Sequence, residues 1–289
     1  MRDDDPNSGG LSRKTIDQEL ENSLDRLRMD TVDRYQIHRQ DPETPIEGTL
    51  GALDDAVRRG KTRYLGASSV WAHQFADALH ASDRLGFERF ATMQNHYNLV
   101  YREEEREMLP LTRKENVGVI PWSPLAGGYL ARPHEESDAM REMTADRYDT
   151  PQSQAINERV RGLADEHDAS MSQIGLAWLL HKDGVTAPIY GTLSVEHPED
   201  AVEAVELDLS DSDIGYLEEP HEPMGRPRPR VAGIRVRHPE LIDSLKTPTP
   251  AIRGADSEPF TPVACEGRPC RRQCASSARG PARRHRSRC

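Results

Sequence analysis

Apolar positions up to about residue 220 follow two spacings, one typical of amphipathic helices and one typical of short buried strands. The first helical pattern runs over 13–28, behind Ser12, a residue type that caps helix starts. Further helices are expected at 46–59, 71–85, 102–116, 156–167, 171–182, 197–205 and 211–219. Strands are expected between them, at 31–37, 62–67, 90–95, 117–122 and 187–190.

Strands that alternate with helices of this length predict βαβ units and a parallel sheet. No strand is followed by GxGxxG, which disfavours a Rossmann dinucleotide-binding domain. A closed (β/α)8 barrel typically needs about 250 residues, and the pattern supplies five strand–helix units. The expected fold is therefore α/β, an incomplete barrel of the (β/α)8 TIM type with about strands 4 to 8, interrupted by a polar loop at 131–155.

The apolar periodicity stops after Pro220. The sequence beyond it is rich in Arg, Pro and Ser and contains GRPRPR, TPTP and RGPARRHRSRC. This composition is typical of disorder, so we expect a partial barrel over 1–220 and a disordered basic tail over 221–289. All four cysteines lie in that tail without the paired CxxC spacing of a zinc site. No metal site is expected.

Charge divides the chain at the same place. The net charge is −11, but residues up to 220 carry 23 Lys and Arg against 43 Asp and Glu, whereas the tail carries 15 against 6. An acidic body repels nucleic acid and anionic membranes, and it suggests a halophilic, high-salt cytoplasm, with an ordinary acidic protein as the alternative. No run of 18 apolar residues and no signal peptide is present, so we expect a cytoplasmic protein.

The carboxyl ends of the expected strands are where a barrel of this type holds its active site. These ends offer one histidine, several amides and hydroxyls, and one indole, a set that suits a planar polar cofactor better than a metal. No GxSxG or GxxxxGK sequence occurs. The positions are His38, Ser68, Ser69, Gln94, Asn95, the run 122–125, Gly191 and Thr192.

Five segments in order resemble the aldo-keto reductases, and most closely the subgroup of potassium-channel β-subunit-like and bacterial stress-type reductases. They read ENSLDRLRMDTVDRYQIHR, LDDAVRRGKTRYLGASS, QNHYN, PWSPLAGGYL and PIYGTLSVEHPEDAVEA, and the resemblance covers 1–220. The family implies a (β/α)8 barrel that binds NADP(H) across the strand ends and reduces aldehydes or ketones by hydride transfer. The expected substrate is a small aldehyde or ketone.

The resemblance implies a role for each matching residue. His38 matches the catalytic histidine, Ser68 and Gln94 match residues that bind the nicotinamide carboxamide, and Trp122 matches the aromatic that stacks on the ring. Ser69, next to Ser68, stands where many members have asparagine. The positions matched to the pyrophosphate loop and then to the adenosine 2′-phosphate and adenine are Ser123, Pro124, Leu125, Ala126, Gly127, Gly191, Leu193, His197 and Asp200. Because Leu193 and His197 depart from the family's usual residues, NAD(H) stays open beside NADP(H).

Physical chemistry supports part of this assignment independently. A hydride donor needs its ring pinned on one face and fixed in rotation by hydrogen bonds to its amide, which Trp122, Ser68 and Gln94 can supply. A neutral histidine can donate to a carbonyl oxygen as charge develops there. The alternatives are that His38 is bound to backbone and that Trp122 fills the core.

The family's catalytic tyrosine, aspartate and lysine lie in its first three strand–helix units, and this sequence resembles the family only from the fourth. We therefore expect an N-terminally truncated chain that is weakly stable and catalytically poor; Tyr35 and Lys14 do not stand at the missing positions. The function expected is that of an NADP(H)-dependent aldo-keto reductase. One alternative is a non-catalytic remnant. A less favoured one is a nucleic-acid binder that uses the Arg-rich tail; out-of-frame translation would also explain the composition of that tail.

Overall fold

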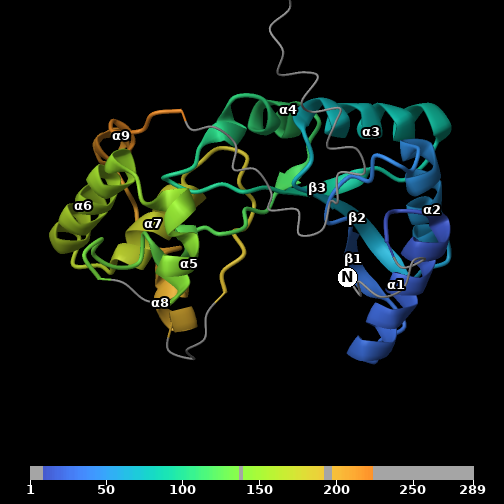
Figure 1. The fold of residues 1–289 in the computed structure, drawn as a ribbon, viewed down its shortest axis with the longest axis horizontal. Helices are drawn as coiled ribbons and strands as arrows, with labels where there is room; N and C mark the ends of the chain where they lie inside the picture. The colour runs from blue at the N-terminus through green and yellow to red at the C-terminus, as the bar shows by residue number, and fades with distance from the viewer. Residues whose placement is uncertain (1–8, 137–138, 192–196, 224–289) are drawn as a thin grey trace, which may run out of the picture. The chain divides into compact units, whose positions relative to one another are not determined.

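Four parallel strands form the sheet in the computed structural model, which describes residues 9–136, 139–191 and 197–223. They lie in the order β1-β2-β3-β4, the order of the chain, so each strand–helix unit places its strand beside the previous one. Figure 1 shows β1, β2 and β3. The strands are β1 (Val32–Gln36), β2 (Thr62–Ser68), β3 (Phe90–Gln94) and β4 (Gly118–Val119).

The connecting helices match the expected pattern through the first three units. They are α1 (Arg13–Leu27), α2 (Ile46–Arg58) and α3 (Ala72–Leu85). Ser12 caps α1, because its hydroxyl accepts a hydrogen bond from the backbone N–H of Thr15 at 3.3 Å. The predicted helix start and the alternation of strands and helices are confirmed here.

Each strand has one face against the helices and one face away from them. Ile37, Leu65 and Met93 are buried in a core shared with Leu53 of α2 and Phe75 of α3. Because strand side chains alternate between faces, their sequence neighbours point to the other, polar face of the sheet.

Glycine at position 66 keeps room on this polar face. A Cβ on Gly66 would lie 2.8 Å from Thr92 Oγ1 and 2.9 Å from Gln36 Oε1. Glycine at this position therefore leaves room for these two side chains over β2. Side chains from β1, β2 and β3 therefore meet on the face that the helices leave open.

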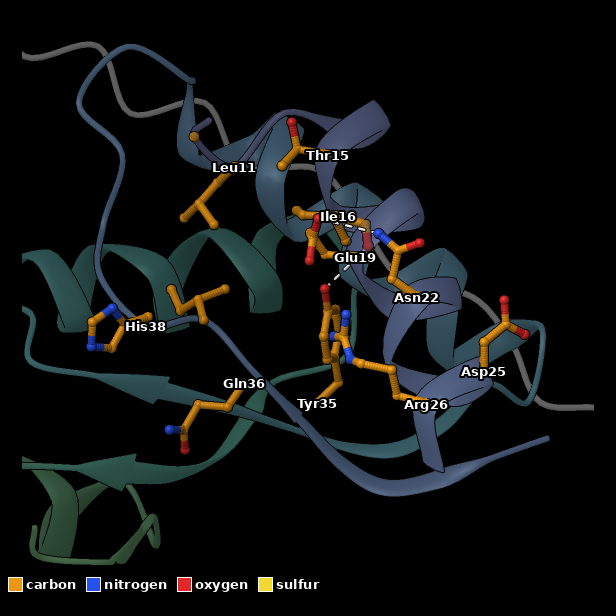
Figure 2. A pocket seen from close by; sticks show the side chains of 12 residues that line it. Leu11, Thr15, Ile16, Glu19, Asn22, Asp25, Arg26, Tyr35, Gln36 and His38 are labelled. Atoms are coloured by element: carbon orange, nitrogen blue, oxygen red, sulfur yellow. Dashed lines mark hydrogen bonds between the residues drawn. The ribbon is translucent and has the colours of Figure 1, made fainter. Parts of the chain in front are cut away.

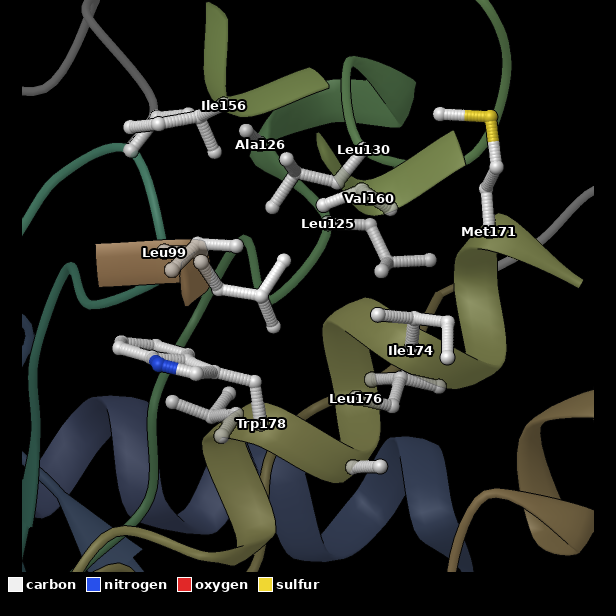
Figure 3. Close-up of a cluster of buried hydrophobic side chains, with 14 of the residues drawn as sticks. Leu99, Leu125, Ala126, Leu130, Ile156, Val160, Met171, Ile174, Leu176 and Trp178 are labelled. Atoms are coloured by element: carbon white, nitrogen blue, oxygen red, sulfur yellow. The ribbon is translucent and has the colours of Figure 1, made fainter. Parts of the chain in front are cut away.

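The second part of the described chain is helical. Its elements are η1 (Glu103–Glu105), α4 (Met108–Lys114), η2 (Ala126–Gly128), α5 (Ala139–Tyr148), α6 (Pro151–Glu166), α7 (Met171–Leu180), α8 (His197–Glu203) and α9 (Asp211–Glu218). Helices α5 to α9 gather around a separate core, in which α7 is the central helix (Figure 3). Trp178 is fully buried there, and its ring lies beside that of Tyr97, with centroids 5.5 Å apart.

Ionic side chains fasten α9 to this core. Glu218 accepts hydrogen bonds from the indole N–H of Trp178 at 2.9 Å and from Arg102 at 2.8 Å, and it also pairs with Lys182. Arg102 makes two further bonds to Glu105, at 2.9 and 2.8 Å. The network links α9 to α7 and to the segment that follows β3.

Two expectations about helices are wrong. The helix expected over 102–116 is broken into η1 and α4, because Pro110 lacks a backbone N–H and fits only the first turn of a helix. The polar loop expected over 131–155 contains α5 and the start of α6. Thr150 caps α6 by accepting a bond from the N–H of Ser153, and Pro151 takes the first helical position.

The last two strands are weaker than expected. The strand expected over 117–122 is reduced to the two residues of β4, and 187–190 forms no strand. Residues before and within 187–190 still run beside β4: Val185 bridges Val119, and the N–H of Ile189 donates to the carbonyl of Pro121 at 2.8 Å. Pro121 and Pro188 cannot donate to a ladder, which explains the interruption. The expected disordered tail lies outside the described residues after 223.

Candidate cofactor site at the strand ends

Three strand ends come together at one edge of the sheet. Ser68, the last residue of β2, is paired in register with Gln94, the last residue of β3. Trp122 follows β4 and pairs with His96, and its backbone N–H donates to the carbonyl of Asn95 at 2.8 Å. The structure thus brings Ser68, Gln94 and Trp122 to the edge at which (β/α) folds hold their sites.

Side-chain alternation places these groups on the polar face. Ala67 and Met93, which precede Ser68 and Gln94, are fully buried against the helices. Since successive residues of a strand point to opposite faces, Ser68 and Gln94 point away from the helices. Gln94 is half-buried, and its carboxamide makes no hydrogen bond with any described residue.

The indole of Trp122 is tied to the end of β2. Its Nε1–H donates to Ser69 Oγ at 3.3 Å, and the N–H of Ser69 donates to the carbonyl of Gln94 at 3.1 Å. Ser69 has a φ of 52°, a left-handed conformation that costs a residue other than glycine roughly 1–2 kcal/mol. Residues with strained backbone are frequent at ligand sites, and here the strained residue is the one that accepts the indole hydrogen bond of Trp122.

The loop after Trp122 holds more strain. Ser123 and Ala126 have φ values of 54° and 51°, whereas Gly127, at 65°, adopts its conformation at little cost. Leu125 and Ala126 are nonetheless buried in the helical core, and Pro124 is buried as well. A cofactor could therefore meet these three residues only through their backbone, whereas Ser123 and Gly127 are half-buried.

His38 lies at the end of β1 with an exposed side chain. The N–H of Ile37 donates to the carbonyl of Gly66 at 3.0 Å, so the ladder between β1 and β2 reaches the residue before His38. His38 also lines a cavity of about 650 Å³ between α1 and β1, which is the edge strand of the described sheet (Figure 2). Figure 2 shows residues of α1, among them Glu19 and Asn22, on the other side of this cavity.

Tyr35 lines the same cavity but is held as a structural group. Its hydroxyl donates to the carbonyl of Ile16 at 3.1 Å (Figure 2). Burial, together with the nearby carboxylates of Glu19 and Asp17, raises the pKa of Tyr35 to about 12. A phenol with such a pKa and a bond to α1 is a poor proton donor at neutral pH.

The positions expected to bind the adenosine end of the cofactor are described only in part. Gly191 is exposed and follows the segment that bonds to Pro121. His197 and Asp200 lie on the backbone of α8, and Leu193 lies outside the described residues. The 2′-phosphate and adenine assignments of these positions stay predictions.

Sequence reasoning missed a group of side chains behind Trp122. His96 is buried and stacks on Trp122, with ring centroids 4.2 Å apart. It also stacks on Tyr101, with ring centroids 4.1 Å apart. Its Nε2 lies 2.6 Å from the hydroxyl of Tyr148, and the guanidinium of Arg147 lies 5.8 Å from the indole centroid. One signal was available: Tyr148 is the only aromatic residue in the polar stretch 131–155.

These strand ends fit the nicotinamide end of a dinucleotide. A half-buried indole presents a ring surface, the amide of Gln94 has capacity to donate and accept, and the hydroxyls of Ser68 and Ser69 lie at the next strand end. The group lacks the donor set of a metal site: no cluster of three His, Cys, Asp or Glu occurs within the described ranges. Among the described helices, none has the length and apolar character to cross a bilayer.

Comparison with known proteins agrees with this geometry. Residues 1–222 match the aldo/keto reductase family. The chain belongs to this family. Its members form (β/α)8 barrels, in keeping with the parallel α/β arrangement of the described strands.

Curated relatives carry reductase and dehydrogenase names. Aldo-keto reductase AFTS1 of Alternaria alternata is 45% identical over 216 residues, which cover 73% of this chain and 58% of the relative. The putative aryl-alcohol dehydrogenase C977.14c of Schizosaccharomyces pombe is 44% identical over 223 residues, covering 75% and 63%. Versiconal hemiacetal acetate reductase of Aspergillus parasiticus is 41% identical over 224 residues, covering 75% and 65%. The chain thus spans about three fifths of the length of these relatives.

Proposed function

We propose that this chain contributes the cofactor end of an NADP(H)-dependent oxidoreductase that transfers hydride to small aldehydes or ketones. The observation that carries the proposal is the half-buried indole of Trp122 at the same strand ends as the carboxamide of Gln94, which makes no hydrogen bond with another residue of the described ranges. Family membership makes oxidoreductase chemistry the expectation for this edge. The dinucleotide, when bound, supplies the hydride.

Each residue of the edge has a physical task in this proposal. Gln94 and Ser68 hydrogen-bond the nicotinamide carboxamide, which fixes the rotation of its ring. Trp122 covers one ring face and leaves the other for the carbonyl substrate. The backbone of Ser123 and Gly127, which both have positive φ values, follows the pyrophosphate.

His38 acts on the substrate. Its exposed imidazole lies at the carboxyl end of β1, at the same edge as Ser68, where it can donate a hydrogen bond to a carbonyl oxygen. Such a donor stabilises the negative charge that develops on oxygen as hydride arrives. We assign His38 this orienting and polarising role.

Neither of the two buried tyrosines discussed above is a ready source of the proton for the resulting alkoxide. Tyr35 and Tyr148 both have raised pKa values, mainly because they are buried, and both hydroxyls are engaged in hydrogen bonds. General acid catalysis typically contributes about 10² to 10⁴ in rate. We therefore propose that reduction by this chain alone is slow, and that the preceding strand–helix units of the family supply the acid.

The names of two relatives suggest the first substrates. One is called a putative aryl-alcohol dehydrogenase and another a reductase of a hemiacetal acetate. An aromatic aldehyde such as benzaldehyde is therefore the substrate to test first, followed by an aliphatic aldehyde and a ketone.

Cofactor binding tests the proposal directly. We expect NADPH to quench the tryptophan emission of the folded chain. The titration is done in molar KCl, which screens the charge of the acidic body. The Trp122→Phe variant should lose most of this quenching. Trp71→Phe is the matched control, because Trp71 is 52% exposed and lies on the N-terminal side of α3. Quenching that survives Trp122→Phe, or none at all from a folded sample, contradicts the proposal. A parallel titration with NADH decides between the two cofactors.

A steady-state assay separates an enzyme from a non-catalytic remnant that binds cofactor. Benzaldehyde-dependent oxidation of NADPH is measured for this chain and for the same chain behind the first three strand–helix units of a family member. We expect the longer protein to be about 10² to 10⁴ times faster, and its His38→Ala variant to lose most of that gain. Equal, negligible rates from both proteins would favour the remnant.

A further inference from the structure

His96 occupies the position directly behind Trp122. The two rings are nearly parallel, with an interplanar angle of 13° and centroids 4.2 Å apart. Tyr101 stacks on His96 in the same way, again at 13°. His96 is only 7% exposed, so it is packed from several sides while it supports an indole that is itself half-buried.

Asn98 lies beside the imidazole of His96. Asn98 Oδ1 accepts bonds from the backbone N–H groups of Val100 and Tyr101, at 3.1 and 2.9 Å, so its Nδ2 must be the donor on the other side. Nδ2 donates to the carbonyl of Ser123 at 2.9 Å and lies 3.4 Å from His96 Nε2. Asn98 therefore brings an amide N–H close to Nε2 of His96 while its oxygen is held by the backbone.

Tyr148 supplies the stronger bond to the same nitrogen. The Tyr148 hydroxyl and His96 Nε2 share a hydrogen bond of 2.6 Å between two buried side chains. Burial raises the pKa of Tyr148, which keeps the phenol protonated and able to donate. Tyr148 is the last residue of α5, so this hydrogen bond connects α5 to the histidine that stacks on the indole of Trp122.

We propose that His96 and Tyr148 are positioning residues that hold the ring plane of Trp122. The hydroxyl of Tyr148 fixes the imidazole in rotation, and the fixed imidazole sets the angle of the indole from behind. The inference rests on the function proposed above: the indole so held is the surface on which the nicotinamide stacks. The α5 segment thereby affects cofactor binding from behind the ring.

Fluorine NMR of the cofactor-free protein tests the ring position. The chain contains three tryptophans, so 5-fluorotryptophan labelling gives three resonances, assigned with Trp71→Phe, Trp122→Phe and Trp178→Phe. We expect Tyr148→Phe to shift or broaden the Trp122 resonance alone. The matched control is Tyr97→Phe, which also removes one hydroxyl hydrogen bond of a buried tyrosine, to Glu105 at 2.6 Å, beside Trp178. This control should move the Trp178 resonance and leave Trp122 in place.

A double-mutant cycle distinguishes positioning from general packing. His96→Phe keeps a stacked ring but cannot form the hydrogen bond to Tyr148, so it should change the Trp122 resonance in the same direction, and the double variant should add little to either single change. His96→Phe also replaces Tyr148→Phe if that variant does not fold. An unchanged Trp122 resonance, equal shifts of all three resonances, or additive shifts in the double variant would each overturn the inference.

Cofactor affinity supplies the second measurement. The dissociation constant of NADPH should rise about threefold to tenfold in Tyr148→Phe, the size of one neutral hydrogen bond, and stay within about twofold in Tyr97→Phe. A constant that is unchanged in Tyr148→Phe, while the unaltered protein binds, overturns the link to the cofactor. If the unaltered protein binds no NADPH, the proposed function fails, and the cofactor-free spectra still decide whether the pair positions Trp122.

Discussion

Two regions of this chain hold their residues in place by different means. In the strand half, residues 9–94, backbone ladders between β1, β2 and β3 fix the positions, and apolar side chains fill one face. In the helical half, residues 95–223 as far as the structure describes them, β4 has only two residues, and side-chain bonds carry more of the organisation.

The candidate site draws on both regions. Ser68 and Gln94 come from the ladder, whereas the loop from Ser123 to Gly127 is held by packing against helices. A change in the ladder region should therefore act on the carboxamide contacts. A change in the helical half should act on the indole and on the loop beside it.

The largest expected effect comes from the centre of the helical half. Trp178 is fully buried and donates to Glu218, so Trp178→Ala should lower the free energy of unfolding by about 3–5 kcal/mol. Trp71→Ala removes the same side chain from a site that is 52% exposed and should cost far less. Urea unfolding measures both losses.

Hydrogen exchange read by mass spectrometry shows where the loss in Trp178→Ala occurs. If the two regions unfold separately, amides of α6 and α7 lose protection first while those of β2 and β3 keep theirs. Equal loss in both regions would mean that they unfold as one cooperative unit, and the comparison drawn above would then describe packing alone.

Acidification should also lower the stability of the helical half more than that of the strand half. Burial alone would raise the pKa of Glu105, but hydrogen bonds from Arg102 and Tyr97 outweigh it and hold the pKa below its ordinary 4.5. A lowered folded-state pKa means that Glu105 contributes stability above pH 4.5, and that this contribution is lost as the pH falls through the lowered value.

Matched variants isolate this contribution. Glu105→Gln should cost about 1.5–3 kcal/mol at pH 7, the range for hydrogen bonds to a charged group, and should flatten the decline in stability below pH 4.5. In the strand half, hydrogen bonds from Thr44 and Leu11 outweigh burial and lower the pKa of Asp41, but Asp41 lies nearer the surface. Asp41→Asn should therefore cost less. Urea unfolding between pH 3 and 7 compares the two, and a larger loss in Asp41→Asn would reverse the comparison.

The two regions also differed in how far sequence could predict them. In the strand half, apolar spacing and Ser12 predicted α1, α2, α3 and three strands because local patterns and packing agree there. In the helical half, Pro110, Pro121 and Pro188 broke elements that apolar spacing alone would have continued. Thr150 and Pro151 are typical of a helix start, but they lie in a polar stretch that lacks the apolar spacing of a helix.

Site prediction divided along similar lines. Ser68, Gln94 and Trp122 reached one edge because strand ends follow from strand positions. The buried side chains of Leu125 and Ala126, and the bond between His96 and Tyr148, depend on contacts across 50 or so residues of chain. Such contacts leave no periodic signal in a sequence, and only the folded structure brings them together.

The smallest expected effect concerns how the helical half holds the site loop. A Cβ on Gly175 in α7 would lie 3.0 Å from Leu125 Cδ2, whereas a Cβ on Gly162 in α6 meets nothing within 4 Å. Alanine favours a helix over glycine by about 1 kcal/mol, so Gly162→Ala should stabilise the chain by about that amount. Gly175→Ala should lose most of this gain, because Leu125 must move aside.

The same pair shows whether packing in the helical half reaches the cofactor. Moving Leu125 displaces the strained turn next to Ser123, so Gly175→Ala should weaken NADPH binding by about twofold to fivefold, which corresponds to less than 1 kcal/mol, whereas Gly162→Ala should leave it unchanged. Fluorescence titration measures the affinity, and thermal unfolding measures the stability. If Gly175→Ala stabilises the chain as much as Gly162→Ala and binds NADPH equally well, Leu125 moves freely. The turn would then owe its shape to its own backbone, through Gly127, and not to the helix behind it.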